Sequence, residues 1–528
     1  MAETVQQLVL ARADDQTTGL AFGDESWSWA ETVGDAAARA HVLAGWAAPD
    51  RPLHVGVLLE NTPEMVRALL AGAVGAHVTA GINATRRGEA LAADVRRADC
   101  QVLLTDAAHL PLLDGLDLGG ARVVDTDGAE WASLTAAASR STEGFSEVGA
   151  MDTFMLIFTS GTSGEPKAVQ VSNFMVVMSG SVLSEKYGLT TADVAYCAMP
   201  LFHSNAIMAA FAPALCGGAA IALAQFSASS FLSDIRRFGA TYMNYVGKPL
   251  AYVLATPELP DDADNPLRTA FGNEASDRDI AEFGRRFGCT VWDGFGSTET
   301  AVIITRTDDT PLGSIGQPFD GVAVYDRETR TECVRARFDA TGAVTNLDAC
   351  VGELVNTQGA GFFSGYYNDK AATESRLDGG MYWSGDLGYR DEAGFIYLAG
   401  RTDDWLRVDG ENLAAAPIES LLLRNPAISQ ACVYAVPDAN VGDQLMATLV
   451  LRDDAVLDPA GFEAFLADQP DLSAKAWPRY VRLATEVPTT ATNKVLKRTL
   501  RTEGTATSDP LWERAERGRS YAATVGSR

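Results

Sequence analysis

The chain has 528 residues, 47% of them hydrophobic and 21% charged, and a formal net charge of −27 at pH 7. This composition is that of a globular protein long enough for several domains. The acidic balance, without basic stripes, argues against nucleic-acid binding. Seven isolated cysteines, no signal-peptide pattern and no long apolar run lead us to expect a cytoplasmic protein without stable membrane insertion.

The first part of the chain alternates predicted helices and strands. A helix is predicted over residues 20–50, and strands over residues 54–60 and 101–105, with a helix beginning at Thr62 and Pro63 between them. This alternation predicts parallel sheets covered by helices.

A loop rich in Gly, Ser and Thr lies between a predicted buried strand at residues 154–158 and a predicted helix beginning at residue 173. Backbone N–H groups in such a loop suit phosphate oxygens, and a lysine adds positive charge. The spacing differs from the G-x-x-x-x-G-K-[ST] loop of other nucleotide-binding proteins. The candidate phosphate-binding residues are Thr159, Ser160, Gly161, Thr162, Ser163, Gly164 and Lys167.

Strands are predicted again at residues 219–223 and 241–246, and Ser276 is predicted to cap a helix that ends at Phe287. A strand at residues 290–293 follows and leads into a second loop. Because ligands bind at the carboxyl ends of parallel strands, we expect this loop to face the phosphate loop. The loop residues are Gly294, Phe295, Gly296, Ser297, Thr298 and Glu299.

The oxygen atoms of Thr298 and Glu299 are of the type that Mg²⁺ on a triphosphate prefers, and Phe295 could stack on a flat base.

Between about residues 312 and 400 glycines become more frequent and the predicted strands become shorter, which predicts a small β-rich subdomain. The residues after Gly400 have their own core candidates and predict a further compact α+β domain.

Residues 158–169 resemble the phosphate-binding signature of the adenylate-forming superfamily of acyl-CoA synthetases, nonribosomal-peptide adenylation domains and luciferases. Five further motifs occur in the order typical of that superfamily. The chain is most similar to bacterial fatty-acyl-CoA ligases of the fatty-acid-transport type. The resemblance implies a large N-terminal AMP-binding domain at 1–401, a hinge at 402–404 and a small mobile C-terminal domain at 405–528.

The resemblance implies roles for single residues in the later motifs. Asp386, in a predicted turn, and Arg401 would hold the ribose, and Asp403 would be the hinge. Gly410 would face the acyl-adenylate and pantetheine in the second half-reaction. Lys494 resembles the catalytic lysine, although Asn493 stands where the superfamily usually has glycine; since asparagine tolerates left-handed backbone, we expect the turn to persist.

The segment Pro200-Leu-Phe-His203 resembles the P-x-x-H motif that borders the carboxylate pocket in acyl-CoA synthetases. The residues expected to line the acid pocket are His203, Asn205, Val246, Gly247, Gly272 and Gly296. Those expected to contact the nucleotide beside the two loops are Gly272, Asn273, Glu274 and Asp293.

The implied reaction uses ATP, Mg²⁺ and coenzyme A to convert a small-molecule carboxylic acid into a thioester through an acyl-adenylate. Two alternatives stay open. The enzyme could load a carrier protein instead of coenzyme A, or it could perform only thioesterification beside a partner ligase. The sequence leaves the identity of the acid and the oligomeric state open.

Overall fold

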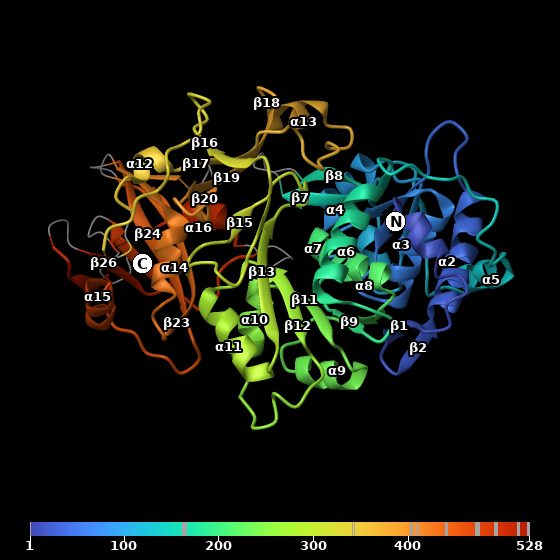
Figure 1. Ribbon diagram of the computed structural model, residues 1–528, viewed down its shortest axis with the longest axis horizontal. Helices are drawn as coiled ribbons and strands as arrows, with labels where there is room; N and C mark the ends of the chain where they lie inside the picture. Colours follow the sequence, from blue (N-terminus) through green and yellow to red (C-terminus); the bar gives the residue numbers. More distant parts are fainter. Residues whose placement is uncertain are drawn as a thin grey trace. The chain divides into compact units, whose positions relative to one another are not determined.

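The computed structural model describes residues 2–160, 166–340, 342, 344–401, 405–408, 411–438, 442–469, 472, 476–489, 495–514 and 518–524 (Figure 1). Its internal contacts divide the chain into two compact units. The first comprises Met1–Ala301 and Ala360–Asp378, and the second comprises Val302–Gly359 and Gly379–Arg528. Helices and sheets alternate along the chain, so the predicted multidomain α/β class is confirmed.

A six-stranded sheet of the first unit has the order β6-β5-β3-β4-β7-β8. Its first five strands are parallel, and β8 pairs antiparallel with β7. The strands β3, β4 and β5 are largely buried, as expected for the inner strands of a sheet with helices on both faces, whereas the edge strand β6 is mostly exposed. Their bounds are β3 His54–Leu58, β4 Val78–Gly81, β5 Val102–Thr105, β6 Arg122–Asp125, β7 Thr153–Ser160 and β8 Pro166–Ser172.

A second sheet of the same unit contains, in order, β13-β12-β11-β9-β10-β1-β2. All neighbours are parallel except β1 and β2. The bounds are β1 Thr18–Phe22, β2 Glu25–Ser28, β9 Val194–Cys197, β10 Ala220–Leu223, β11 Tyr242–Val246, β12 Thr269–Asn273 and β13 Thr290–Gly296.

Most connections between these strands are helices, as a parallel sheet requires. The last helix of the unit is followed by a short strand, β18 Leu377–Asp378. The helices are α1 Val5–Leu10, α2 Trp29–Ala44, α3 Pro63–Gly75, α4 Gly88–Arg97, the 3₁₀ turn η1 Leu110–Leu113, α5 Ala129–Ala137, α6 Asn173–Tyr187, α7 Ser204–Ala206, the π-helical turn η2 Ile207–Phe211, α8 Ala212–Gly217, α9 Phe231–Phe238, α10 Gly247–Leu254, α11 Asp277–Phe287 and α13 Lys370–Arg376.

The helix predicted over residues 20–50 is wrong in its first part. Residues 18–28 form the hairpin of β1 and β2, which turns at Gly23 with φ of +57°. The helix begins only after Ser28, whose side chain accepts from the Glu31 N–H while the Glu31 carboxylate accepts from the Ser28 N–H. This capping box defines the start of the helix.

The strand predicted at residues 154–158 and the helix predicted from residue 173 are confirmed, but a further strand, which was not predicted, lies between the phosphate loop and the helix. The loop connects two antiparallel strands, β7 and β8, and β8 precedes the helix. Residues 166–172 form a strand in which the side chains of Val169 and Val171 are buried. Ser172 then caps α6, accepting from the N–H of Met175 at 3.3 Å. The loop following the strand at residue 290 is likewise shorter than predicted, because β13 continues to Gly296.

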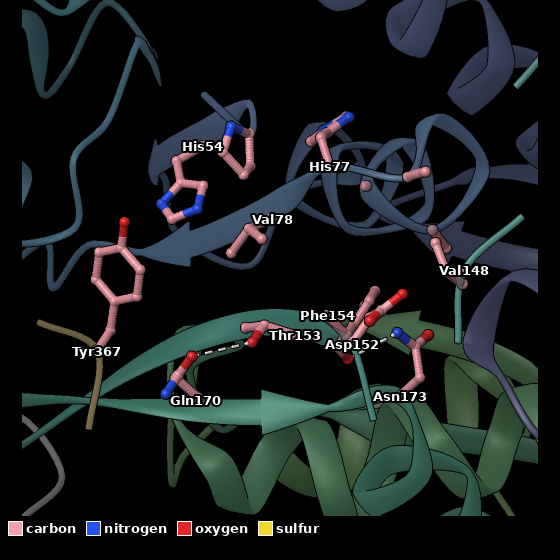
Figure 2. Close-up of a pocket in the computed structure, with 14 residues that line it drawn as sticks. His54, His77, Val78, Val148, Asp152, Thr153, Phe154, Gln170, Asn173 and Tyr367 are labelled. Atoms are coloured by element: carbon pink, nitrogen blue, oxygen red, sulfur yellow. Dashed lines mark hydrogen bonds between the residues drawn. The ribbon is translucent and has the colours of Figure 1, made fainter. Parts of the chain in front are cut away.

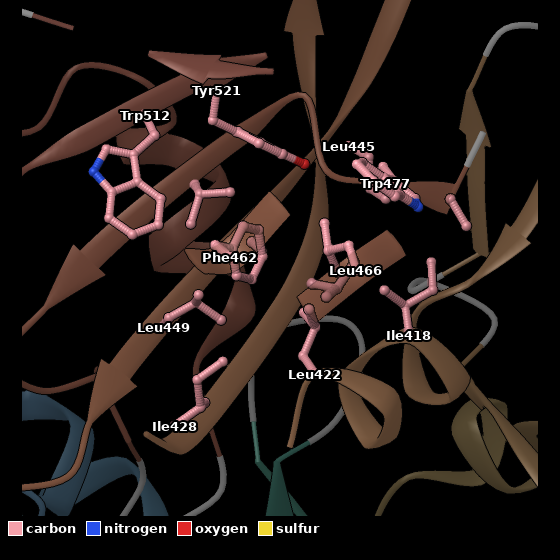
Figure 3. Close-up of a cluster of buried hydrophobic side chains, with 14 of the residues drawn as sticks. Ile418, Leu422, Ile428, Leu445, Leu449, Phe462, Leu466, Trp477, Trp512 and Tyr521 are labelled. Carbon is pink, nitrogen blue, oxygen red and sulfur yellow. The ribbon is translucent and has the colours of Figure 1, made fainter. Parts of the chain in front are cut away.

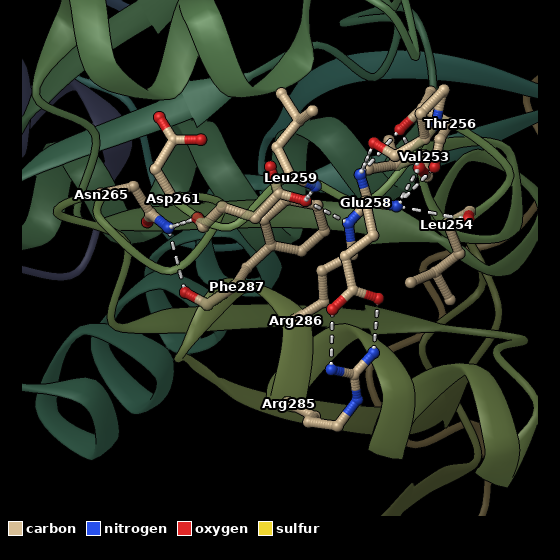
Figure 4. Close-up of polar contacts among 12 residues, drawn as sticks. Val253, Leu254, Thr256, Glu258, Leu259, Asp261, Asn265, Arg285, Arg286 and Phe287 are labelled. Atoms are coloured by element: carbon tan, nitrogen blue, oxygen red, sulfur yellow. Dashed lines mark hydrogen bonds and ion pairs between the residues drawn. The ribbon is translucent and has the colours of Figure 1, made fainter.

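A buried arginine fixes the connection between α10 and β12 (Figure 4). The Arg286 side chain, 6% exposed as a residue, donates to Asp262 Oδ2 at 2.6 Å and to the Thr256 carbonyl at 2.8 Å. Since a guanidinium has five N–H donors, one residue of α11 can bind several turns of this connection at once. The connection therefore leads β12 into the sheet in a defined position.

The second unit is richer in strands, as predicted for residues 312–400. Strands β16, β17, β19 and β20 pair antiparallel in chain order, and β14 pairs with β15. Asp386 lies within β19 and not in the predicted turn, because the strand extends through Gly385 to Arg390. The elements are β14 Ile303–Thr305, β15 Gln317–Pro318, β16 Val322–Tyr325, α12 Leu347–Cys350, β17 Gly352–Asn356, β19 Met381–Arg390 and β20 Ile396–Arg401.

The C-terminal part of this unit has its own five-stranded sheet, β23-β24-β25-β26-β27. Its core joins Leu445 and Leu449 of β24 with Phe462 of α15 and Trp512 of β26 (Figure 3). The elements are β21 Trp405–Val408, β22 Glu411–Ala414, α14 Ala415–Leu422, β23 Ile428–Asp438, β24 Gly442–Leu451, α15 Pro459–Ala467, β25 Tyr480–Ala484, α16 Lys497–Glu503, β26 Leu511–Arg514 and β27 Tyr521–Thr524. Of the helices described in either unit, none combines the length and apolarity needed to cross a membrane.

Candidate active site

Three neighbouring parallel strands of the first unit, β11, β12 and β13, end side by side (Figure 1). Their register pairs Val246 with Asn273 and Gly272 with Asp293. The structure thus brings together, at the carboxyl ends of these strands, residues that the sequence predicts to bind nucleotide and acid. This is the edge of a parallel sheet at which ligands bind.

Glycines allow the backbone to close tightly at this edge. A Cβ atom on Gly247 would overlap the carbonyl oxygen of Glu274, and one on Gly272 would overlap the carbonyl oxygen of Tyr245. Glu274 itself has φ of +68°, in the left-handed region that non-glycine residues rarely adopt. Such backbone occurs preferentially at functional sites, where the surrounding structure holds it in place.

A chain of asparagines connects the start of α7 with these strands. The Asn205 amide donates to the Tyr245 carbonyl at 3.0 Å and to Asn273 Oδ1 at 2.7 Å. Asn244 in turn donates to Asn205 Oδ1 at 2.7 Å. His203 is the residue before α7, so these bonds also determine where its ring lies relative to the strand ends.

Asp293 binds the segment that follows β12. Its Oδ2 accepts from the Tyr245 hydroxyl at 2.9 Å and from the Ala275 N–H at 3.1 Å, and the residue is 8% exposed. Asp293 therefore helps to hold Glu274 in its left-handed conformation, between the strand and Ala275.

The turn after β13 meets β8 through a tyrosine. Glu299, 7% exposed, accepts from the Tyr366 hydroxyl at 2.7 Å, and the Lys167 ammonium lies 5.1 Å from the centre of the Tyr366 ring. Burial, together with the negative charge of Glu299, raises the pKa of Tyr366, which therefore remains a hydrogen-bond donor. Thr298 shares a 2.8 Å hydrogen bond with Ser204 at the start of α7.

Sequence reasoning missed Tyr366. It is placed because the Gly365 carbonyl accepts from Gln170 and the Tyr367 N–H donates to Ala168, so residues 365–367 lie along β8. No spacing in the sequence relates Tyr366 to Glu299, 67 residues earlier. The contact depends on pairing between distant segments.

In the second unit, Asp386 of β19 lies directly opposite Arg401 of β20. The Asp386 N–H donates to Ser384 Oγ at 3.0 Å, and the Gly385 N–H donates to the buried Glu353 carboxylate at 2.7 Å. The two residues predicted to hold the ribose are thus neighbours across one strand pair. The predicted residues outside the described part of the chain are Gly161, Thr162, Ser163, Gly164, Asp403, Gly410 and Lys494, as are the side chains of Ser160 and Arg401.

A cavity of about 390 Å³ lies elsewhere in the first unit, where β3, β4 and β7 begin (Figure 2). Thr153 is at that end of β7, whereas the candidate phosphate-binding residues Thr159 and Ser160 are at the other. Polar side chains of the cavity wall bond to the protein itself: Thr153 donates to Gln170, and Asn173 donates to the Asp152 carbonyl. The cavity is therefore separate from the candidate active site.

The buried side chain of His77, which lines this cavity, leads us to expect that the stability of the protein depends on pH. Burial, with a smaller contribution from His54, lowers the pKa of His77 to about 4. Between pH 6.5 and 4 the unfolded chain binds a proton that the folded chain does not, so stability falls as pH falls. From pH 7.5 to pH 5 this amounts to about 2 kcal/mol.

His77→Gln removes this titration, so its urea midpoint should fall less than that of the wild type over the same pH interval. His41→Gln, at a partly buried histidine, is the matched control and should follow the wild type. Parallel curves for all three proteins would show that His77 does not contribute.

Comparison with known proteins assigns the chain to a family. The family model of the AMP-binding enzyme matches residues 9–367, and that of the AMP-binding enzyme C-terminal domain matches residues 417–494. The chain belongs to the AMP-binding enzyme family.

Two similar relatives cover nearly the whole chain. The medium/long-chain-fatty-acid–CoA ligase FadD17 of Mycobacterium marinum is 50% identical over 510 residues, 96% of this chain and 98% of that protein. The steroid-22-oyl-CoA synthetase of Rhodococcus jostii is 46% identical over 520 residues, 98% and 94% of the two chains. The fold is similar to that of ATP-bound MatB from Rhodopseudomonas palustris, with a TM-score of 0.83 and 23% identity over 95% of this chain and 99% of that chain.

The protein is an ATP-dependent acid–thiol ligase, an AMP-forming acyl-CoA synthetase. It activates a carboxylic acid with ATP to an acyl-adenylate, transfers the acyl group to coenzyme A, and releases pyrophosphate and AMP. The resemblance stated from the motifs is confirmed. The alternatives of carrier loading and of a partner ligase receive no support from these relatives.

Proposed function

We propose that the acid is bulky and apolar, either a medium- to long-chain fatty acid or the side-chain acid of a steroid. The single observation that carries this proposal is the near full-length similarity to two ligases named for such acids. The acids for which the two relatives are named differ in shape: a fatty acid is a flexible chain, whereas a steroid acid contains a fused ring system. They share a large apolar body attached to one carboxylate.

For the nucleotide we propose two sets of residues in the first unit, at the end of β7 and at the ends of β12 and β13, and one pair of residues in the second unit. Thr159, Ser160 and Lys167, with residues 161–164, would bind the phosphates. Asp386 and Arg401 would bind the ribose, in agreement with their position opposite each other. The nucleotide residues at the strand ends would be Gly272, Asn273, Glu274, Asp293, Gly294, Phe295, Gly296 and Ser297.

The oxygen atoms of Glu299 and Thr298 fit Mg²⁺. Glu299 is a buried carboxylate whose Oε1 accepts from Tyr366, which orients the group. Mg²⁺ is usually bound by one or two protein groups together with substrate phosphates, so two protein oxygen ligands are enough. When bound there, Mg²⁺ would neutralise phosphate charge.

In the first half-reaction a carboxylate oxygen attacks the α-phosphorus of ATP, and the bond to pyrophosphate breaks. Both reactants are anions, so positive charge must be placed near the reacting atoms. We assign this role to Lys494 and Lys167. His203, Asn205, Val246 and Gly247 would surround the carboxylate and the adjoining part of the acid.

In the second half-reaction the sulfur of coenzyme A attacks the acyl carbon, AMP leaves, and the thiol proton passes to solvent. We propose that Asp403 is the hinge between a domain at 1–401 and one at 405–528, and that Gly410 faces the adenylate in this step.

The seven free cysteines are consistent with a cytoplasmic location.

A panel of acids in a pyrophosphate-release assay tests the proposed substrate. Octanoate, dodecanoate, palmitate and a steroid-22-oic acid are compared with acetate, malonate and benzoate. We expect kcat/KM to be at least about tenfold higher for the bulky apolar acids, since each buried methylene group contributes about 0.8 kcal/mol of binding free energy. A preference for any of the three small acids would contradict the proposal.

A further inference from the structure

The helix whose first residues lie in the proposed acid site contains an unusual turn. α7, η2 and α8 follow one another without a break from Ser204 to Gly217, and η2 is π-helical. The first residues of this helix, Ser204 and Asn205, make the bonds to Thr298, Asn273 and the Tyr245 carbonyl. A π turn contains one residue more than an α turn, and such turns occur often at functional sites.

Pro213 explains the π turn. The Ala212 N–H donates to the Ile207 carbonyl, five residues earlier, which is the π pattern. Proline has no N–H, so Pro213 cannot donate a hydrogen bond to the carbonyl of Ala209, four residues earlier, or to that of Met208, five residues earlier. A buried carbonyl without a donor would be costly.

Both carbonyls are bonded by side chains of neighbouring elements. Ser179 of α6 donates its hydroxyl to the Met208 carbonyl at 3.1 Å. Tyr242, at the start of β11, donates its hydroxyl to the Ala209 carbonyl at 2.7 Å. Tyr242 is 0% exposed, so water does not compete for this bond.

The helix beyond the π turn is held against α6. A Cβ atom on Gly180 would lie 2.6 Å from the Ala212 carbonyl oxygen and 2.7 Å from Cys216 Sγ. This packing fixes α8. If the π turn changed to an α turn, the residues before the turn would therefore have to move. An α-helix has 3.6 residues per turn, so one residue less would rotate Ser204 and Asn205 by roughly 100°.

We infer that the hydroxyls of Tyr242 and Ser179 are positioning groups for the acid site: they hold the π turn that aims His203, Ser204 and Asn205 at the ends of β11, β12 and β13. This inference rests on the proposed location of the acid. It assigns a function to two residues that do not touch the substrate.

Tyr242→Phe and Ser179→Ala test the inference. With dodecanoate as the acid in the pyrophosphate-release assay, KM for the acid should rise roughly tenfold in Tyr242→Phe, the order expected when a buried carbonyl loses its donor. KM for ATP should rise by a smaller factor than KM for the acid, because Asn273 and Thr298 lose only a contact to the residues that move. Pro213→Ala supplies the missing N–H and should raise KM for the acid in the same way without the loss of a hydroxyl.

Tyr187→Phe is the matched control. The rings of Tyr187 and Tyr242 are 5.8 Å apart, and the Tyr187 hydroxyl is buried with no hydrogen-bond partner in the described structure. The same chemical change there should leave both KM values unchanged. Equal increases in KM for acid and ATP in Tyr242→Phe, or an equal effect of Tyr187→Phe, would overturn the inference.

Hydrogen exchange separates this inference from the proposed substrate. Amides of residues 205–212 should exchange faster in Tyr242→Phe than in the wild type or in Tyr187→Phe. If no fatty or steroid acid is activated by the wild type, the proposed substrate fails, whereas unchanged exchange at these amides overturns the positioning role itself.

Discussion

Acid-dependent pyrophosphate release is expected to fall about 10²–10³-fold when Glu299 is replaced by glutamine. Glutamine keeps the size of the side chain and can still accept from the Tyr366 hydroxyl, which lies 2.7 Å from Glu299 Oε1. The change therefore removes the charge and leaves the local packing in place. Because a neutral amide is a weaker ligand for Mg²⁺ than a carboxylate, the variant should also require more Mg²⁺.

Glu258→Gln is the control for this experiment. Glu258 is an exposed glutamate whose two oxygens pair with Arg285 at 2.9 and 2.8 Å, outside the site (Figure 4). Its activity should match that of the wild type, and thermal unfolding of both variants should show that they are folded. A Glu299→Gln enzyme with the rate and Mg²⁺ dependence of the wild type would contradict the role assigned to Glu299.

The two half-reactions are expected to respond differently to Lys494→Ala. Formation of the acyl-adenylate should fall about 10²–10³-fold or more, because the positive charge between two anionic reactants is lost. Thioester formation from a supplied acyl-adenylate and coenzyme A should stay within a few-fold of the wild type, since the acyl-phosphate mixed anhydride is already activated. Pyrophosphate release measures the first step, and thioester formation from synthetic adenylate measures the second.

Lys497→Ala provides the matched lysine, three positions further along the chain. Lys497 Nζ lies 2.8 Å from Glu419 Oε1 in an ion pair of the second unit, which gives it a structural role. We expect its loss to alter stability slightly and to affect both half-reactions equally. Equal loss of both half-reactions in Lys494→Ala would show that this lysine does not act in adenylation alone.

The family and the reaction could be predicted from the sequence because both depend on short segments. The loop from Thr159 to Lys167 and the turn at Thr298 and Glu299 can each be recognised within a few residues, and both lie in the part of the chain that the family model of the AMP-binding enzyme matches. The predicted α/β class was also correct, since alternation of helices and strands is a local property.

Errors arose where a local pattern had two interpretations. The segment after the phosphate loop is apolar enough for a helix or a strand, and its pairing with β7 decides for β8. Asp386 between glycines is typical of a turn, yet β17 and β20 on either side keep it in a strand. In both segments hydrogen bonds to distant strands outweigh the local preference of the sequence.

The sequence by itself determined the family and the class of reaction, because its short motifs resemble those of adenylate-forming enzymes. The tertiary structure alone decided which groups bond the Glu299 carboxylate and the carbonyls of the π turn: Tyr366 bonds the first, and Tyr242 and Ser179 bond the second. The physical reason is that a buried carboxylate or carbonyl must find a hydrogen-bond donor, and the donors here come from segments that only folding brings together.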